Sequence, residues 1–284
     1  MTERALLFGC EGALLAGILH APAPAVSATG VLIIVGGPQY RVGSHRQFTL
    51  LAREIAARGH AVMRFDVRGM GDSEGESPGF EALGPDIRAA LAEFLRQVPA
   101  IRSVVLWGLC DGASAALLNC DAHPAVAGLV LVNPWVRTGA GEARAVMRHY
   151  YFQRLLQRSF WRKVLAGQWS LVRSLQEFAG VARRAQREDT GGVRQSGSFL
   201  ARMLSTARRY EDPILLLISE QDLTAAEFVD LCRDSAEWRS ALARKNVSWE
   251  RLRGADHTFS GREHLQAAVR VTCQWLASVA SPVR

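Results

Sequence analysis

Hydrophobic and polar positions along the first 134 residues alternate between short apolar runs and amphipathic segments. The apolar runs contain many β-branched residues and are followed closely by glycine or proline, which is typical of buried strands. Between them, apolar residues recur at helical spacing, as Phe48, Leu51 and Ile55 do before Gly59. We expect two strands at the N-terminus, further strands at residues 31–35, 61–65, 103–107 and 128–132, and helices at about 45–58, about 83–94 and 111 to about 120.

The alternation of strands and helices breaks after Asn133, and residues 135–210 have the pattern of amphipathic helices with no convincing strand. Strands return at residues 213–219 and near 247–252, and a last helix is expected at 262–277. Strands that alternate with helices form right-handed crossovers and a mostly parallel sheet. The sequence therefore predicts one α/β domain with flanking helices, built from residues 1–134 and 211–284, with a helical cap at 135–210 inserted after the sixth strand.

The size and composition of the chain fit such a domain. A chain of 284 residues buries a substantial core, and it contains no run of about 18 uncharged apolar residues that would predict a membrane span. The N-terminal stretch lacks a basic leader, so we expect no signal peptide. The five cysteines are scattered without a C-x-x-C pair, which argues against a disulfide framework or a zinc site and favours a cytoplasmic location. We expect no metal and no cofactor.

The stretch WGLCDGASAALL predicts a strand that enters a helix through a sharp turn, with Cys110 at its apex. Gly108 and Gly112 carry no Cβ, which lets such a turn close. The start of the helix favours a thiolate at Cys110, whereas the neighbouring Asp111 opposes it unless its carboxylate points away, as we expect. Isolated cysteines are also common in protein cores, so the alternative is a buried thiol between two glycines.

Two further residues support a catalytic role for Cys110. Asp222 follows the strand PILLLIS, and His257 lies in GADHTF, on the loop before the last helix. A nucleophile, then an acid, then a histidine is the chain order of hydrolases that use this turn. All three residues come at the carboxyl ends of strands, where open α/β sheets place their sites. Glu220 is a rival carboxylate to Asp222 within the same short loop.

The chain resembles an α/β-hydrolase along nearly its whole length, on the residues GGPQ, FDVRGMGDSEG, GLCDG and GADHTF. The loop FDVRGMGDSEG matches the D-x-R-G-x-G-x-S-x-G pattern that this family carries after its fourth strand. Cysteine in place of serine at residue 110 is similar to dienelactone-hydrolase-like members. A narrower resemblance is to the exosortase A system-associated hydrolases, bacterial proteins whose genes accompany exopolysaccharide and protein-sorting systems.

Our hypothesis assigns one role to each of these residues. Cys110 attacks an acyl carbonyl, His257 takes or holds the thiol proton, and Asp222 orients the imidazole. The backbone N–H of Asp111, with that of Gly37 or Gln39, is expected to form the oxyanion hole, because Pro38 has no N–H to donate. Asp66 and Asp72 are expected to be structural, as turn residues of the loop after the fourth strand.

The insertion carries the basic excess of the chain, with 15 Lys and Arg against 4 Asp and Glu in residues 135–210, whereas the other residues have 19 against 23. Arg158 and Arg162 lie four residues apart with Trp161 beside them, and we expect these three to contact substrate. Arginines that bind an anionic headgroup beside an apolar acyl pocket suit a coenzyme A, carrier-protein or lipid-phosphate conjugate. Peripheral contact with an anionic membrane surface is the alternative, and no motif indicates a nucleic acid partner.

The function that fits these patterns is an acyl-processing hydrolase: a thioesterase, esterase or lactonase that uses a covalent acyl-enzyme. Two alternatives remain open from the sequence. The same acyl-enzyme is able to pass its acyl group to an acceptor other than water, which makes an acyltransferase. A protein that keeps the fold as a non-catalytic binding module is the second alternative.

Overall fold

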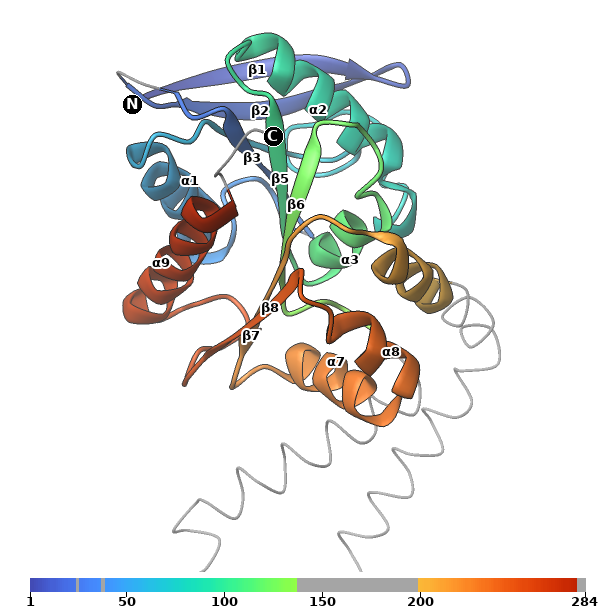
Figure 1. The fold of residues 1–284 in the computed structure, drawn as a ribbon. Helices are drawn as coiled ribbons and strands as arrows, with labels where there is room; N and C mark the ends of the chain where they lie inside the picture. Colours follow the sequence, from blue (N-terminus) through green and yellow to red (C-terminus); the bar gives the residue numbers. More distant parts are fainter. Residues whose placement is uncertain (24–25, 37–38, 137–198, 280–284) are drawn as a thin grey trace, which may run out of the picture.

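A computed structural model describes residues 1–23, 26–36, 39–136 and 199–279 of the chain. Its centre is an eight-stranded sheet (Figure 1). The strands are β1 (Thr2–Cys10), β2 (Ala13–Ala21), β3 (Thr29–Ile34), β4 (Val62–Phe65), β5 (Ser103–Leu109), β6 (Val126–Val132), β7 (Ile214–Ser219) and β8 (Val247–Leu252). Their order across the sheet is β1-β2-β4-β3-β5-β6-β7-β8.

The sheet is parallel except at β2, which pairs antiparallel with both β1 and β4. From β4 to β8 every neighbouring pair is parallel, so the carboxyl ends of β3, β5, β6, β7 and β8 meet at one edge. This is the α/β-hydrolase fold that the sequence predicts, and the mostly parallel sheet is confirmed. The edge formed by the carboxyl ends is where the predicted site residues come together.

The helices are α1 (Gln47–Ala57), α2 (Gly84–Gln97), α3 (Asp111–Leu118), α7 (Leu223–Asp234), α8 (Ala236–Leu242) and α9 (Arg262–Val279), with short 3₁₀ turns η1 (Ser44–Arg46) and η2 (Phe80–Ala82). The start of α1 lies slightly later than predicted, because His45 and Arg46 adopt positive φ angles of 54° and 62°. A left-handed backbone does not continue a helix, so η1 precedes α1.

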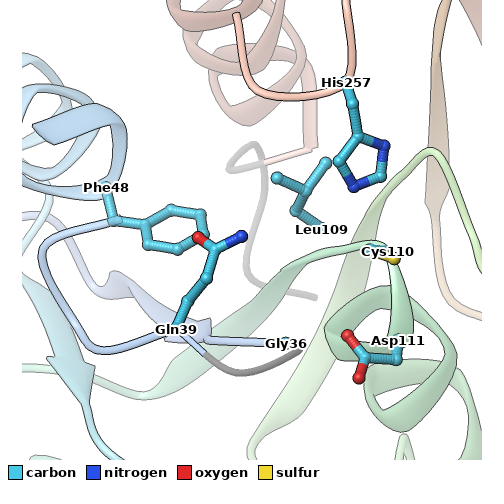
Figure 2. Close-up of a pocket in the computed structure, with 7 residues that line it drawn as sticks. All are labelled: Gly36, Gln39, Phe48, Leu109, Cys110, Asp111 and His257. Carbon is cyan, nitrogen blue, oxygen red and sulfur yellow. The ribbon is translucent and has the colours of Figure 1, made fainter. Parts of the chain in front are cut away.

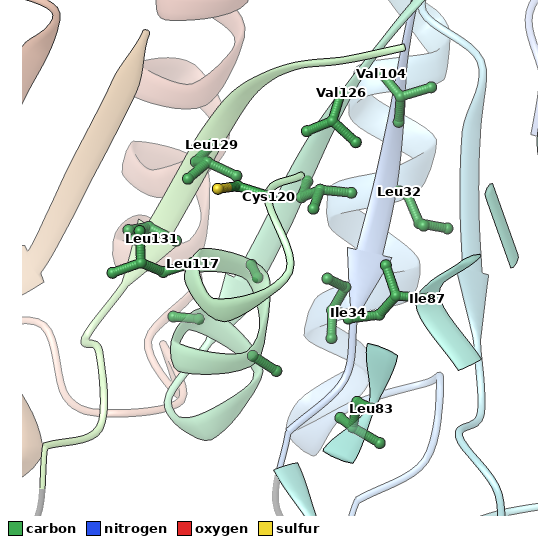
Figure 3. Close-up of a cluster of buried hydrophobic side chains, with 14 of the residues drawn as sticks. Leu32, Ile34, Leu83, Ile87, Val104, Leu117, Cys120, Val126, Leu129 and Leu131 are labelled. Atoms are coloured by element: carbon green, nitrogen blue, oxygen red, sulfur yellow. The ribbon is translucent and has the colours of Figure 1, made fainter. Parts of the chain in front are cut away.

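Helices cover both faces of the sheet, and alternate residues of each strand supply the two cores. On one face, Val31 and Ile33 of β3 pack with residues of α1 and α9. On the other face, Leu32 and Ile34 pack with residues of α2 and α3, as Figure 3 shows for part of this cluster. Because both faces are buried, the central strands are continuous apolar runs rather than alternating ones, which is the pattern seen in the sequence.

Trp135, at the start of the predicted insertion, and Phe199, which the prediction also assigns to it, meet in an aromatic cluster beside α3. Trp135, which follows β6, stacks on Phe199 with ring centroids 5.6 Å apart, and Phe80 of η2 contacts both rings edge-on. Phe199 is the first described residue of a helical segment that extends to residue 209, and the buried side chains of this segment belong to the same core as α2 and α3. The predicted contact residues Arg158, Trp161 and Arg162 lie outside the described residues.

No helix in the described ranges has both the length and the apolar character needed to cross a membrane.

Candidate active site

Cys110 stands at the apex of the turn between β5 and α3, with φ 61° and ψ −127°. A non-glycine residue in this backbone region is strained, so the surrounding structure must hold it there. A Cβ on Gly108 would lie 2.3 Å from the carbonyl oxygen of Gly112, and one on Gly112 would lie 2.6 Å from that of Ile34. Both glycines are therefore required by close backbone approach, and the predicted sharp turn is confirmed.

Hydrogen bonds fix the turn to the neighbouring strand ends. The N–H of Cys110 donates to the carbonyl of Val132 at 2.9 Å, and the N–H of Trp135 donates to the carbonyl of Cys110 at 3.3 Å. The buried hydroxyl of Ser114 donates to the carbonyl of Trp135 at 2.7 Å. These bonds tie the segment after β6 to both sides of the apex, so the strained backbone at Cys110 is held in place.

Asp222 and His257 come together at the same edge of the sheet. The Nδ1 atom of His257 lies 2.7 Å from Oδ2 of Asp222, and Oδ1 of Asp222 accepts the N–H of Thr224 as the N-cap of α7. The rival carboxylate, Glu220, instead accepts the N–H of Gly254 at 2.9 Å. The structure thus pairs His257 with Asp222 and uses Glu220 in the turn after β8.

The imidazole of His257 carries a raised pKa. Burial alone lowers the pKa, but hydrogen bonds to the Asp222 carboxylate and to the Cys110 side chain, with the negative charges of both groups, outweigh it. The resulting pKa is about 10, against an ordinary value of 6.5. His257 is therefore placed to carry a proton between Asp222 and the sulfur of Cys110 at neutral pH.

A pocket of about 140 Å³ opens beside Cys110 and His257. Gly36, Gln39, Phe48, Leu109 and Asp111 complete its lining, and Figure 2 shows how these side chains surround it. The carboxylate of Asp111 turns toward Gly36 rather than toward the sulfur, which agrees with the expected orientation. The predicted oxyanion residue Gln39 lies in this lining, whereas Gly37 lies outside the described residues.

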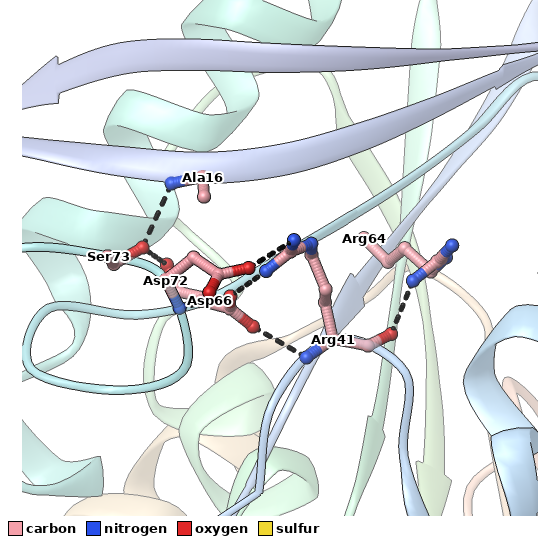
Figure 4. Close-up of polar contacts among 6 residues, drawn as sticks. All are labelled: Ala16, Arg41, Arg64, Asp66, Asp72 and Ser73. Carbon is pink, nitrogen blue, oxygen red and sulfur yellow. Dashed lines mark hydrogen bonds and ion pairs between the residues drawn. The ribbon is translucent and has the colours of Figure 1, made fainter.

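Ion pairs anchor the chain that follows Gln39. The guanidinium of Arg41 contacts both Asp66 and Asp72, and the backbone N–H groups of Arg41 and Asp72 donate to Asp66 (Figure 4). Asp66 is 1% exposed, and its two carboxylate oxygens accept three of these hydrogen bonds. The structural role predicted for Asp66 and Asp72 is thus supported by their contacts, which hold the loop between β3 and α1 next to Cys110.

Several residues at the site could not be identified as site residues from the sequence. Phe48 lines the pocket, but its apolar helical spacing indicated only a core position. Asn133 has φ 46°. Its side-chain oxygen accepts the N–H of Ser219, and its NH2 group donates to the hydroxyl of Ser219, which ties the end of β6 to the end of β7. The sequence signal for this contact with Ser219 was the asparagine itself, because asparagine tolerates a positive φ and this one stands where the alternation of strands and helices ends.

Within the described part of the chain, no group of three or more His, Cys, Asp and Glu side chains is placed to hold a metal ion.

Comparison with known proteins places the chain among hydrolases. The profile of the family described as serine aminopeptidase, S33, matches residues 27–257, a span that contains Cys110, Asp222 and His257. That description names serine, whereas the turn of this chain carries Cys110. Among curated proteins, none matches this chain.

Solved structures with the same fold extend over the whole chain. An esterase of Pyrococcus furiosus is 14% identical with a TM-score of 0.66, and the alignment covers 99% of this chain and 94% of that one. An esterase domain from Rhodothermus marinus is 18% identical with a TM-score of 0.61 and coverage of 99% and 100%. A proline iminopeptidase of Mycobacterium smegmatis is 13% identical with a TM-score of 0.64 and coverage of 98% and 99%.

At these identities the structures show a shared fold, while the family profile covers most of the sequence, the turn and both partner residues included. The chain belongs to the serine aminopeptidase S33 family of α/β-hydrolases.

Proposed function

We propose that this protein hydrolyses an ester or thioester bond through a covalent acyl-enzyme on Cys110, with His257 and Asp222 as its catalytic partners. The observation that carries the proposal is the imidazole of His257, whose Nδ1 lies 2.7 Å from Asp222 and which lines the same pocket as Cys110. An imidazole held by a carboxylate and set against a nucleophile is the arrangement of acyl-transfer triads. The esterases that share the fold support the choice of bond, because two of the structures described above carry that name.

Each step of the proposed reaction uses a group at the site. The sulfur of Cys110 attacks the acyl carbonyl, and the negative oxygen that forms accepts the backbone N–H groups of Asp111 and of Gln39. His257 donates its proton to the leaving thiolate or alkoxide as the bond to the acyl carbon breaks, which leaves Cys110 acylated.

Acylation then prepares His257 for the second half of the reaction. It removes the charge and the hydrogen bond of Cys110, two of the influences that raise the pKa of His257. The neutral imidazole then takes a proton from water, the hydroxide adds to the acyl carbon, and the C–S bond breaks to release the free acid. The proton returns to the sulfur or remains on His257, so the cycle closes.

The proposed substrate carries an anionic headgroup on its leaving side. The basic excess of residues 135–210 and the aromatic and arginine residues Arg158, Trp161 and Arg162 support this choice. A coenzyme A, carrier-protein or lipid-phosphate conjugate supplies both the headgroup and an acyl chain, and an anionic membrane surface offers the same charge. In each case the charged part lies outside the pocket that holds the acyl group.

The proposed setting of the reaction is the cytoplasm, in association with an exosortase-linked exopolysaccharide system. All five cysteines are free thiols, which suits a reducing compartment. The narrower resemblance of the chain to the exosortase A system-associated hydrolases supports the association with that system.

Intact-mass spectrometry after incubation with a panel of acyl thioesters and activated esters tests the proposal. We expect the mass of one acyl group on the wild-type protein, at Cys110 after peptide mapping, and the same adduct on the Cys120→Ala control. Cys110→Ala should form no adduct and lose turnover. An adduct that persists in Cys110→Ala, or turnover that survives it, would contradict the proposed nucleophile, and a product transferred to an added alcohol or amine would identify an acyltransferase.

A further inference from the structure

The backbone of Cys110 is held on both sides by one short stretch of the chain that follows β6. Its N–H donates to the carbonyl of Val132 at 2.9 Å, and its carbonyl accepts the N–H of Trp135 at 3.3 Å. Asn133 lies between these two contacts, is fully buried and has a φ of 46°. A contact that fixes Asn133 therefore also fixes the turn that carries the sulfur.

The side chain of Asn133 continues the link between β6 and β7 where the backbone pairing stops. The register of the two strands ends at the pair Val132 and Leu217, and the left-handed backbone of Asn133 does not continue a strand. Beyond that pair, Oδ1 of Asn133 accepts the N–H of Ser219 at 2.7 Å, and its NH2 group donates to the Ser219 hydroxyl at 3.0 Å. Ser219 is 1% exposed, so its N–H depends on this acceptor rather than on water.

Ser219 leads directly into the loop that carries Asp222, and this loop is joined to the loop of His257. The N–H of Gln221 donates to the carbonyl of Ala255 at 2.9 Å. The side chains of Asp222 and His257 meet at 2.7 Å. Because these contacts join the two loops at two points, the acid and the imidazole move together when the end of β7 shifts.

A series of hydrogen bonds thus connects the turn of Cys110 with the two loops, and it crosses from β6 to β7 at Asn133. We propose that Asn133 is a positioning residue: through Ser219, it sets where the imidazole of His257 stands relative to the sulfur. This inference rests on the proposed function, since it concerns the alignment of the same reacting groups. The links at Cys110 and at Gln221 join backbone groups, whereas the link at Asn133 is made by its side chain, so a substitution removes it selectively.

The experiment measures kcat and KM of two variants with the N-acetylcysteamine thioester of butyrate. Glycine adopts a positive φ freely, so Asn133→Gly removes both side-chain bonds and keeps the course of the backbone. We expect kcat to fall by about 100-fold, which is the cost of a misplacement of about 1 Å at a reacting group. KM should stay within about twofold, because other residues line the pocket.

Ser219→Ala is the milder variant, since it loses the hydroxyl bond and keeps the N–H bond to Asn133. It should lower kcat by about tenfold, again without a change in KM, and it tests the role even where Asn133→Gly does not fold.

Ser103→Ala is the matched control at the opposite edge of the sheet. The hydroxyls of Thr29 and Ser103 lie 2.8 Å apart and join the first residues of β3 and β5. This link also connects two neighbouring strands through side chains, but it lies at their amino ends, away from the site. Ser103→Ala should therefore lower the Tm and keep kcat within about twofold of the wild type.

The contrast between the two serine variants decides the role of Asn133. A lower Tm for Ser219→Ala with an unchanged kcat would overturn the positioning role, because the bonds would then support only the fold. Equal losses of kcat in Ser219→Ala and Ser103→Ala would overturn it too. Both results would leave the acyl-enzyme on Cys110 intact, whereas a wild-type protein that is neither acylated by the thioester nor turns it over would contradict the proposed function and the role of Asn133 with it.

Discussion

The two ends of α3 carry a cysteine each, and they place it in opposite surroundings. Cys110 precedes the first turn, is partly exposed, has a positive φ and lines the same pocket as His257. Cys120 follows the last turn and is 4% exposed, within the buried apolar cluster that also contains Leu117 and Leu129 (Figure 3). Burial raises the pKa of the Cys120 thiol to about 12.

This contrast shows that position in the fold, rather than residue type, decides whether the thiol of a cysteine is buried or partly exposed. A thiol in apolar surroundings loses the solvation that a thiolate needs, so Cys120 stays protonated and inert. At the other end of the same helix, the turn places the sulfur of Cys110 at the edge of the sheet, where His257 also lies. Four measurements would break or sharpen the comparison.

Removing each sulfur in turn should give the largest difference. Cys110→Ala should lower kcat for a reactive thioester by about 10⁴-fold, because the covalent route is lost and only binding and the oxyanion donors remain. Cys120→Ala should leave kcat within about twofold per folded molecule, although the small cavity lowers stability. Steady-state kinetics measures kcat for both variants. Similar losses of kcat in the two variants would contradict the proposed difference between Cys110 and Cys120.

Alkylation by iodoacetamide at pH 7 should label Cys110 about 10³-fold faster than Cys120. The reagent reacts with thiolates, and a thiol with a pKa of about 12 is almost fully protonated at this pH. Peptide mapping over time gives both rates in one sample. Cys232, whose thiol also has a pKa raised to about 12 by burial, is an internal control that should remain as slow as Cys120.

Asp222→Asn should lower kcat/KM by about 100-fold. Its one amide oxygen keeps the N-cap bond to the N–H of Thr224, so its NH2 group replaces Oδ2 and donates to Nδ1 of His257, which favours the imidazole tautomer with its proton on Nε2 and leaves no charge to stabilise an imidazolium. Asparagine is as good an N-cap as aspartate, so α7 should keep its start and the variant should fold. Glu220→Gln is the matched control two residues away and should change kcat/KM only slightly. If the two variants exchanged these effects, the acid of the site would be Glu220.

The pH dependence of stability should give the smallest effect. A histidine whose folded pKa of about 10 exceeds its unfolded value of about 6.5 adds stability that is full below pH 6.5 and is lost as the pH rises toward 10. The Tm difference between the wild type and His257→Asn should therefore shrink by a few degrees from pH 6 to pH 8.5. The Tm difference for Cys120→Ala should stay constant over that range, since a Cys120 thiol with a pKa of about 12 stays protonated across it.

The fold was predictable from the sequence because burial on both faces of the sheet restricts which residues the central strands contain. The central strands are continuous apolar runs, and glycines stand where a backbone must pass closely, as at Gly108 and Gly112. The order of Cys110, Asp222 and His257 at strand ends was enough to predict that they meet, since parallel strands share one edge.

The choice between Asp222 and Glu220 needed coordinates, because both follow β7 and only the path of the loop decides which carboxylate faces His257. Phe48 is a second example of this limit. Its helical spacing predicted a core position, while only the coordinates place it in the lining of the pocket beside Cys110. Contacts between residues far apart in the chain leave no periodic signal in the sequence.

The stacked pair of Trp135 and Phe199 has a consequence for how this protein changes over evolutionary time. Because these two rings hold residues 135 and 199 side by side, the cost of closing the stretch between them grows only slowly with its length. Insertions and deletions between the two rings should therefore cost the sheet little stability, so the length of this stretch is free to drift while the sheet edge at Cys110, Asp222 and His257 stays unchanged.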